Sequence, residues 1–178
     1  ILAYSVKDIS SVVQDIFSQK KIPFTAKTKG TYFDSIEISI ILAFLSIIDN
    51  PYQDTELFTV LHSPIYSFTF DELAKIKIVL PEKSFYSALI HYTTAENKNR
   101  DPKTIHKINI FLSDFNRWRE ISLNSTINEL LQTIYDDTDY YNYVGLLPNG
   151  NLRRANLKIF QEKAIQFEKT NSKGLFKF

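Results

Sequence analysis

The stretch IIDNPYQDTELFTVLHSP, residues 47–64, decides how the chain is organised. An apolar helical run ends at Asn50-Pro51, because a residue that precedes proline is disfavoured in helical backbone angles. Asp54 carries a typical N-cap side chain, and it predicts a new helix over 54–62. The proline at the end of the quoted stretch stops that helix in turn. The pattern therefore predicts a defined turn between two packed helices.

The residues before this turn predict a small α/β piece. ILAYS (1–5) has the pattern of a strand, residues 7–21 have helical spacing, and IPFTA (22–26) is extended. Strand, helix and strand in so short a stretch are typical of a βαβ unit. Few further strands follow, so we expect the sheet to be incomplete.

The residues around and after the turn predict helices. Residues 33–49 form an apolar run that we expect to be deeply buried. Further helices are predicted over 69–80, 83–93, 102–123, 125–138 and 151–170, with linkers over 95–101 and 140–150. Thr69 with Glu72 and Ser125 with Glu129 are the predicted helix starts. The predicted fold is mainly α, a helical bundle preceded by a partial α/β segment, with the border near Ser63-Pro64.

Composition narrows the possible functions. The 178 residues include no Cys, which excludes disulfides and thiolate metal sites. Met is also absent, and the chain opens directly on a strand pattern, so we expect an internal fragment of a longer protein. A formal charge of +1 is not that of a strongly basic nucleic-acid binder. There is no signal peptide or membrane-length apolar run, and the 14 Phe and 10 Tyr predict aromatic helix cores.

Catalytic motifs are absent from the sequence. It has no GxxxxGK[ST] phosphate loop and no GxSxG serine, and its three His lack metal-ligand spacing. Asp136, Asp137 and Asp139 cluster at a predicted helix end, where a cation site is one interpretation and a solvated helix end is the other. We therefore predict no catalytic residue and no metal site in this chain, and its own enzymatic status stays uncertain.

Basic residues form the candidate DNA-binding groups. The first is Lys98, Arg100, Lys103 and Lys107, and the second is Arg153, Arg154 and Lys158. A helix face with several cations can follow a phosphate backbone because each cation releases a counterion, although a solvated face is the alternative. Arg153 has a further alternative, an ion pair with the 136–139 carboxylates, which would make it structural. Arg117 and Arg119 flank Trp118, which is expected to be a core ring.

Two stretches resemble a known family. Residues 30–65 resemble the A subunit of AddAB (RexAB) ATP-dependent helicase–nucleases, in which a YF-x-x-x-E-[VI] segment leads through IDNPxQD to a VLRSPI-like turn. The matching residues are Tyr32, Phe33, Glu37, Ile38, Ile48 to Pro51, Gln53, Asp54, Val60, Leu61, Ser63, Pro64 and Ile65. Residues 138–168 resemble the LPGG-x-x-R-x-ANL segment of the same family. The R-x-x-N-L pattern at Arg153, Asn156 and Leu157 also resembles UvrD/PcrA-like helicases. His62 stands where the family usually has Arg.

The resemblance implies a place within a larger DNA-repair and recombination machine. Residues 1–65 would be part of motor domain 2A, and 66–178 most of the helical accessory domain 2B. The ATP- and magnesium-dependent motor and the nuclease of the parent protein would lie outside this fragment, so no cofactor is expected within it. The implied partners are duplex DNA, the remaining domains of the parent chain and an AddB/RexB-type partner subunit, without a membrane, in a bacterial cytoplasm.

Two functions follow as hypotheses. The first is an accessory region that contacts duplex DNA through its backbone, without sequence preference and with strong salt dependence. The second is a protein–protein interaction module with no direct DNA contact, which the near-neutral charge and abundant Tyr favour.

Overall fold

The structure is a computed structural model that describes Val13, Ile16, Phe17, Lys20, Ile22 and residues 35–94 and 100–170. Its helices are α2 (Ile36–Asp49), α3 (Asp54–His62), α4 (Phe70–Val79), α5 (Phe85–Thr94), α6 (Pro102–Asn124), α7 (Ile127–Thr138), α8 (Tyr140–Leu146) and α9 (Gly150–Thr170). No strand occurs within the described ranges, and the prediction of a mainly α fold is confirmed. Except for a few residues, the predicted βαβ piece over 1–26 lies outside the described part of the chain.

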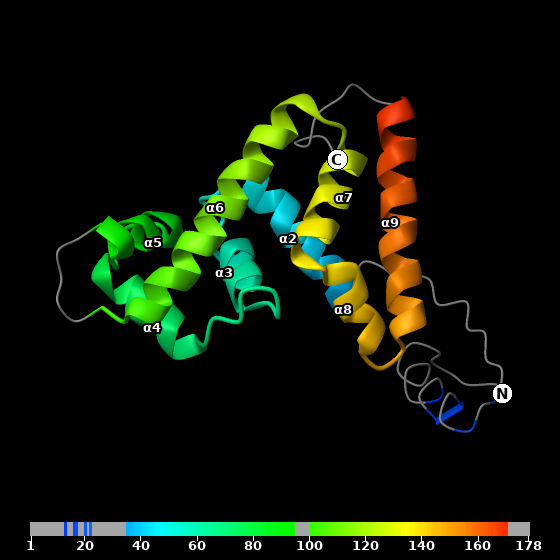
Figure 1. Cartoon of the computed structure of the whole chain (residues 1–178), viewed down its shortest axis with the longest axis horizontal. Coiled ribbons are helices and arrows are strands. Elements are labelled where there is room, and N and C mark those ends of the chain that lie inside the picture. The colour runs from blue at the N-terminus through cyan, green and yellow to red at the C-terminus, as the bar shows by residue number, and fades with distance from the viewer. Residues whose placement is uncertain are drawn as a thin grey trace. The chain divides into compact units, whose positions relative to one another are not determined.

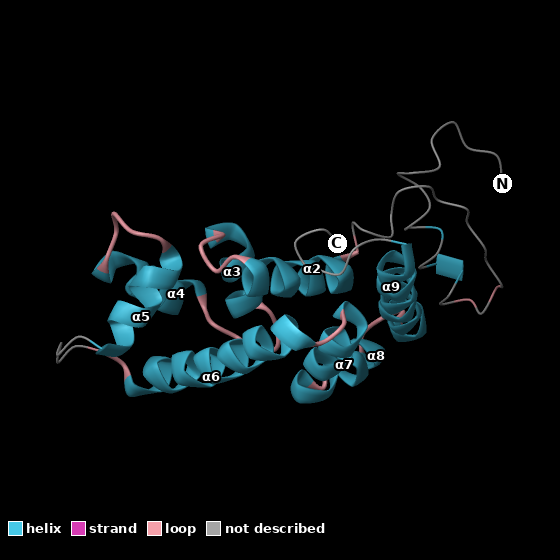
Figure 2. Ribbon diagram, turned by 90° about the horizontal axis from the view of Figure 1, so that it is seen from above, coloured by secondary structure: helices cyan, strands magenta, loops and turns pink. Residues whose placement is uncertain are grey.

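Helices α2 and α6 connect the two ends of the helical unit (Figure 1). Helix α2 packs against α3, α6 and α9, while α6 packs against α5 near its start and α7 near its end. Figure 2 shows α9 almost end-on while α2 and α6 lie across the view, so α9 crosses their direction. Residues Ile36–Phe178 form one compact unit and Ile1–Ser35 another. The border between domains 2A and 2B near residue 65 stays a prediction.

An aromatic core lies between α2, α6 and the chain that leads into α4. Trp118 is fully buried and packs its edge against Phe44, with ring centroids 5.4 Å apart. Tyr66 packs edge-on against Phe111 at 5.2 Å, and Phe111 stacks on Phe115 at 5.5 Å. The predictions of an aromatic core and of a buried Trp118 are therefore confirmed.

Helix starts follow local capping rules, with one correction. Helix α4 has the predicted capping box between Thr69 and Glu72. Helix α7 begins from Thr126, not Ser125, and the Thr126–Glu129 spacing completes a second capping box. The Ser125 hydroxyl instead donates to the Ile121 carbonyl at the end of α6. The predicted start is one residue off because both residues have suitable hydroxyls.

The prediction that Asp54 caps its own helix is wrong. The N-cap of α3 is Gln53, without a side-chain hydrogen bond to the helix. The Asp54 carboxylate accepts a hydrogen bond from the backbone N–H of Phe85, the first residue of α5, at 2.8 Å. It also lies 3.6 Å from the Lys77 ammonium. Asp54 thus satisfies a free amide of another helix and fixes the turn at residues 50–53 against α4 and α5.

The predicted linker over 140–150 is wrong for its first half, which forms α8. Tyr140 and Val144, four residues apart, are both buried, so this short helix is stabilised by packing. Gly145 looks like a loop residue in the sequence, but any Cβ there would collide with the Arg154 guanidinium. A Cβ at Gly150 would likewise meet the Gly145 backbone. These glycines allow the close approach of α8 and α9.

Candidate functional site

The first basic group is largely engaged within the protein. Lys98 lies outside the described residues, and the Arg100 guanidinium donates to the Tyr92 carbonyl. Lys103 is exposed in the first turn of α6. Lys107 is paired with Glu72: its ammonium lies 2.9 Å from both carboxylate oxygens and 5.2 Å from the centre of the Phe68 ring. Lys107 therefore ties α6 to α4.

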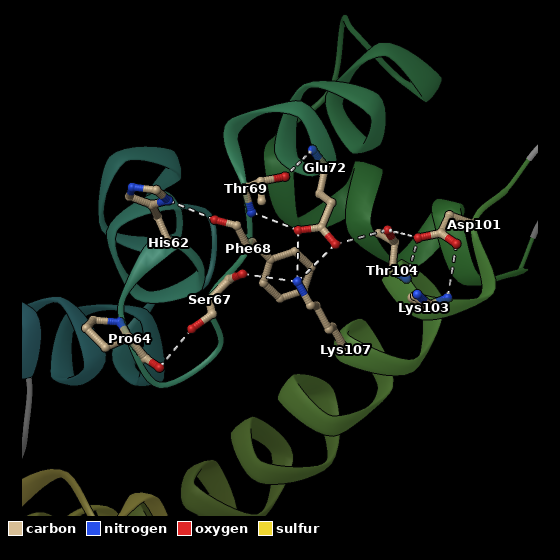
Figure 3. A network of polar contacts seen from close by, with 10 residues as sticks. All are labelled: His62, Pro64, Ser67, Phe68, Thr69, Glu72, Asp101, Lys103, Thr104 and Lys107. Atoms are coloured by element: carbon tan, nitrogen blue, oxygen red, sulfur yellow. Dashed lines mark hydrogen bonds and ion pairs between the residues drawn. The ribbon is translucent and has the colours of Figure 1, made fainter. Parts of the chain in front are cut away.

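Glu72 is the centre of a polar network between α3, α4 and α6 (Figure 3). Its carboxylate accepts from the Thr69 backbone N–H at 2.7 Å, from Lys107, and from the Thr104 hydroxyl at 3.4 Å. Partial burial alone would raise the pKa of Glu72, but the hydrogen bonds from Thr69 and Lys107 lower it. The charged form is thus favoured, and the network holds the start of α4.

His62, the last residue of α3, contacts the segment that leads into α4. Its Nδ1 donates to the Phe68 carbonyl at 2.8 Å (Figure 3). Its ring also stacks on Phe70, with centroids 4.2 Å apart. The His62 side chain thus satisfies a carbonyl in the segment between α3 and α4. This is a structural contact within the chain.

The second basic group begins with Arg153, whose partner is Glu37. The Arg153 Nη1 lies 2.6 Å from Glu37 Oε2, and its Nε donates to the Pro148 carbonyl at 3.1 Å. Asn156 Nδ2 donates to the other Glu37 oxygen, Oε1, at 2.8 Å. The ion pair of Arg153 is therefore with α2, and not with the 136–139 carboxylates considered from the sequence.

Arg154 and Lys158 lie four residues apart, on the same side of α9, and we call them the α9 basic face. The Arg154 guanidinium lies over the Tyr141 ring at 5.3 Å and donates to the Tyr141 carbonyl and the Asn142 side chain, each at 3.2 Å. Lys158 is exposed. The two cations therefore border the junction of α8 and α9, with Arg154 held in place and Lys158 facing solvent.

A polar groove of about 400 Å³ lies beside the α9 basic face, between α7, α8 and α9. It is lined by Gln132, Tyr135, Asp136, Asp139, Tyr141, Asn142, Lys158 and Gln161. Several of its side chains bond one another: Gln161 donates to Gln132 at 3.1 Å, and Gln132 donates to Asp136 at 2.9 Å. The groove thus has two carboxylates on its wall as well as Lys158.

The three carboxylates at the end of α7 have separate partners. Asp137 pairs with Arg117 and accepts from the Trp118 indole N–H at 2.7 Å, while Asp139 accepts from Asn142 at 2.7 Å. Within residues 35–94 and 100–170, no three His, Asp or Glu side chains converge as a metal site would require. The cation-site interpretation of this cluster therefore gains no support.

The two basic groups do not form one surface. The start of α6, with Lys103 and Lys107, packs beside α4 and α5 (Figure 1). The start of α9, with Arg153 to Lys158, lies beside α8 at the other end of α2 (Figure 1). Any DNA contact must use one group at a time, or bridge both ends of the unit.

Glu37 is a functional residue that the sequence indicates only as part of the family motif, without a predicted structural role. Glu37 is 2% exposed, although its two neighbours in the sequence are isoleucines and the run to Ile48 is otherwise almost wholly apolar. A lone carboxylate in an apolar helix needs a buried partner. That signal was available, but it could not identify Arg153 and Asn156, more than 100 residues further on.

Comparison with known proteins confirms the resemblance. The chain is 40% identical over 183 residues to the A subunit of the ATP-dependent helicase/nuclease of Clostridium beijerinckii, a match that covers all of this chain and 15% of that protein. It is 38% identical over 178 residues to the protein of the same name from Lysinibacillus sphaericus, with 14% of that protein covered. The Listeria monocytogenes protein is 37% identical over 169 residues, 93% of this chain. The chain thus spans about 15% of the length of these relatives, and no family model matches it.

Among the helices of the described ranges, none is both long enough and apolar enough to cross a bilayer.

Proposed function

We propose that this chain, which is similar over its whole length to a segment of the A subunits of ATP-dependent helicase/nucleases, is an accessory region of such a protein. Residues 1–65 would belong to motor domain 2A and 66–178 to helical domain 2B. The parent protein would use ATP and magnesium in parts outside this segment, act in DNA repair and recombination, and pair with an AddB/RexB-type partner. Within it, the helical unit contacts duplex DNA without sequence preference.

The α9 basic face supports the DNA contact better than the other predicted residues do. Arg153 and Lys107 are neutralised by Glu37 and Glu72. Lys158 is exposed, and Arg154 is held at the surface by Tyr141 and Asn142. An ordered guanidinium and an exposed ammonium four residues apart suit adjacent phosphates of one strand. This pair is the observation on which the proposed contact rests.

The neighbouring groove limits where a phosphate can lie. Asp136 and Asp139 are on its wall, and their carboxylates repel a phosphate at close range. We therefore place the DNA backbone at the rim of the groove, where the exposed Lys158 lies, and not inside the groove beside the two carboxylates. Lys103, at the other end of the unit, remains a separate and weaker candidate.

The experiment is fluorescence anisotropy of a labelled duplex, titrated with the whole chain at several salt concentrations. Arg154→Glu with Lys158→Glu should weaken binding and reduce the slope of log K against log salt by about 2, since each lost phosphate contact removes about 0.9. The matched control is Lys75→Glu with Lys83→Glu, which makes the same change of charge at exposed positions near α4.

Two results would contradict the DNA contact. Absence of binding even at low salt would leave the protein-interaction alternative. An equal loss in the control variant would mean that bulk charge, and not the α9 basic face, governs binding. The alternative itself is favoured by exposed apolar side chains near the α8–α9 junction, of which Leu146 is 86% and Leu152 47% exposed.

A further inference from the structure

Glu37 is almost removed from solvent, and α9 occupies both of its carboxylate oxygens. Oε2 accepts from Arg153 Nη1 at 2.6 Å, and Oε1 accepts from Asn156 Nδ2 at 2.8 Å. The buried Tyr140 hydroxyl of α8 also donates to the Glu37 backbone carbonyl, at 3.4 Å. The first turn of α2 is therefore bonded to α8 and α9 through three separate groups.

These contacts define which side of α9 faces inward. Arg153 and Asn156 are three residues apart and lie on one side of the helix, toward α2. Arg154 and Lys158 lie on a different side, because each residue turns the helix by about 100°. A rotation of α9 that brought Arg154 inward would separate Glu37 from both of its partners.

Apolar packing alone specifies this rotation less strictly. Leu157, Phe160 and Ala164 form the buried stripe of α9, and apolar side chains tolerate small rotations with repacking. A buried carboxylate that accepts from two directional donors does not tolerate such rotations, because any shift leaves a charge or a hydrogen-bonding group unpaired. Two further hydrogen bonds restrict the rotation of α9: Arg153 donates to the Pro148 carbonyl, and Arg154 donates to the Tyr141 carbonyl.

We propose that Glu37 is the positioning residue of the α9 basic face: it fixes the rotation of α9 so that Arg154 and Lys158 lie beside α8, on the side of α9 turned away from Glu37, where they can meet the DNA backbone. This inference rests on the proposed DNA contact for its functional half. Its structural half, the dependence of α9 on Glu37, stands apart from DNA.

The test exchanges the two groups of the Glu37–Asn156 hydrogen bond, so that the amide is at position 37 and the carboxylate at position 156. In Glu37→Gln, the Arg153 guanidinium loses its carboxylate partner, whichever way the Asn156 amide turns to pair with the new amide. In Asn156→Asp, the new carboxylate replaces an amide that lies 2.8 Å from the Glu37 carboxylate, so two negative charges face each other. In the double variant, the amide introduced at position 37 donates to the carboxylate introduced at position 156, and a negative charge again lies near Arg153.

We expect each single variant to accelerate amide exchange in residues 150–158 by about tenfold or more, because local opening becomes easier. The double variant should return exchange to within about threefold of the original chain. Duplex binding should follow the same order: weaker in the singles and recovered in the double. Glu120→Gln, an exposed change on α6, is the control and should alter neither. If Glu37→Gln does not fold, Asn156→Ala replaces it, with the Glu37–Arg153 pair intact and a smaller loss expected.

Three results would overturn the inference: unchanged exchange in the singles, no recovery in the double variant, or altered exchange with unaltered DNA binding. The last leaves the proposed function standing if Arg154→Glu with Lys158→Glu still weakens binding. Conversely, if that charge reversal has no effect on duplex binding, the proposed function fails, and the exchange data alone decide whether Glu37 positions α9.

Discussion

At the scale of single residues, Asp114 of α6 and Asp137 of α7 have pKa values shifted in opposite directions. Burial raises the pKa of Asp114, whose Oδ2 accepts from the Tyr66 hydroxyl at 3.1 Å. The hydrogen bond from Arg117 lowers the pKa of Asp137, and the Trp118 indole N–H acts in the same direction. Asp137 therefore stabilises the fold when charged, while the charge of Asp114 opposes it.

Replacing Asp137 with Asn should produce a pH-dependent loss of stability. The folded-state pKa of Asp137 lies below its unfolded value, so its contribution is present above the ordinary aspartate pKa of about 3.9 and is lost as pH falls through the folded value. We expect Asp137→Asn to lower the free energy of unfolding by about 1 kcal/mol at pH 7. The difference should shrink below about pH 4. Urea unfolding followed by fluorescence of Trp118, the one tryptophan of the chain, measures it.

The control for that experiment is Asp136→Asn, one residue earlier. The Asp136 carboxylate accepts an exposed hydrogen bond from the Gln132 side chain, one turn back on the same helix. Its replacement should change stability little at any pH. A constant difference between the original chain and Asp137→Asn from pH 7 to pH 3 would refute the role assigned to the Asp137 charge.

At the scale of elements, α7 illustrates how one helix start is satisfied both locally and from afar. The Thr126 hydroxyl accepts from the Glu129 N–H at 3.2 Å, and the Glu129 carboxylate accepts from the Thr126 N–H at 2.8 Å. The next amide, of Ile127, donates to Glu168 of α9 at 2.6 Å. The start of α7 is thereby joined to the far end of α9.

Thr126→Ala should therefore destabilise the protein more than Ser125→Ala does. Loss of the capping hydroxyl should lower the free energy of unfolding by about 1 kcal/mol. Ser125→Ala removes only a bond to the Ile121 carbonyl, so its effect should stay within about 0.5 kcal/mol. Urea unfolding of the two variants separates them, and Thr126→Ser, which retains the hydroxyl, should resemble the original chain. A larger loss in Ser125→Ala would assign the cap to Ser125.

The helices were predictable where their signals are local. Helix α3 runs over the predicted residues 54–62, and α6 begins at the predicted Pro102, because proline and capping side chains act on their own backbone. Helix α8 was missed because its stability comes from the burial of Tyr140 and Val144 against other helices. Asp54 was assigned to the wrong helix for the same reason: its partner, Phe85, is distant in the sequence.

The candidate site was less predictable than the fold. Sequence clustering placed Arg153, Arg154 and Lys158 together, and α9 does bring them together. An ion pair was considered for Arg153 from the sequence, but with the 136–139 carboxylates. The partner is Glu37, which lies more than 100 residues earlier in the chain and could not be identified from the sequence. Lys107 was likewise grouped by sequence proximity, whereas its role depends on Glu72 of α4.

At the scale of the whole helical unit, two charged contacts join distant parts of the chain at its two ends. The Glu72–Lys107 pair joins α4 to α6, and the Glu37–Arg153 pair joins α2 to α9. Helices α2 and α6 run between these ends and are tied to each other through the aromatic core, in which Trp118 meets Phe44. The unit therefore has an ion pair between helices at each end and a mainly aromatic core between them.

This arrangement predicts that the two ends contribute independently to stability. Lys107→Met combined with Arg153→Met should give the sum of the single effects on the free energy of unfolding, within about 0.5 kcal/mol, because distant sites with no shared partner add. Lys107→Met combined with Glu72→Gln should deviate from the sum by about 0.5–3 kcal/mol, because those side chains are in direct contact. Urea unfolding of the three single and two double variants provides both comparisons, with the second as the positive control. A deviation above about 1 kcal/mol for the distant pair would contradict this independence. It would mean that α2 and α6 transmit strain between the ends, so that breaking the Glu37–Arg153 pair changes the contribution of the Glu72–Lys107 pair.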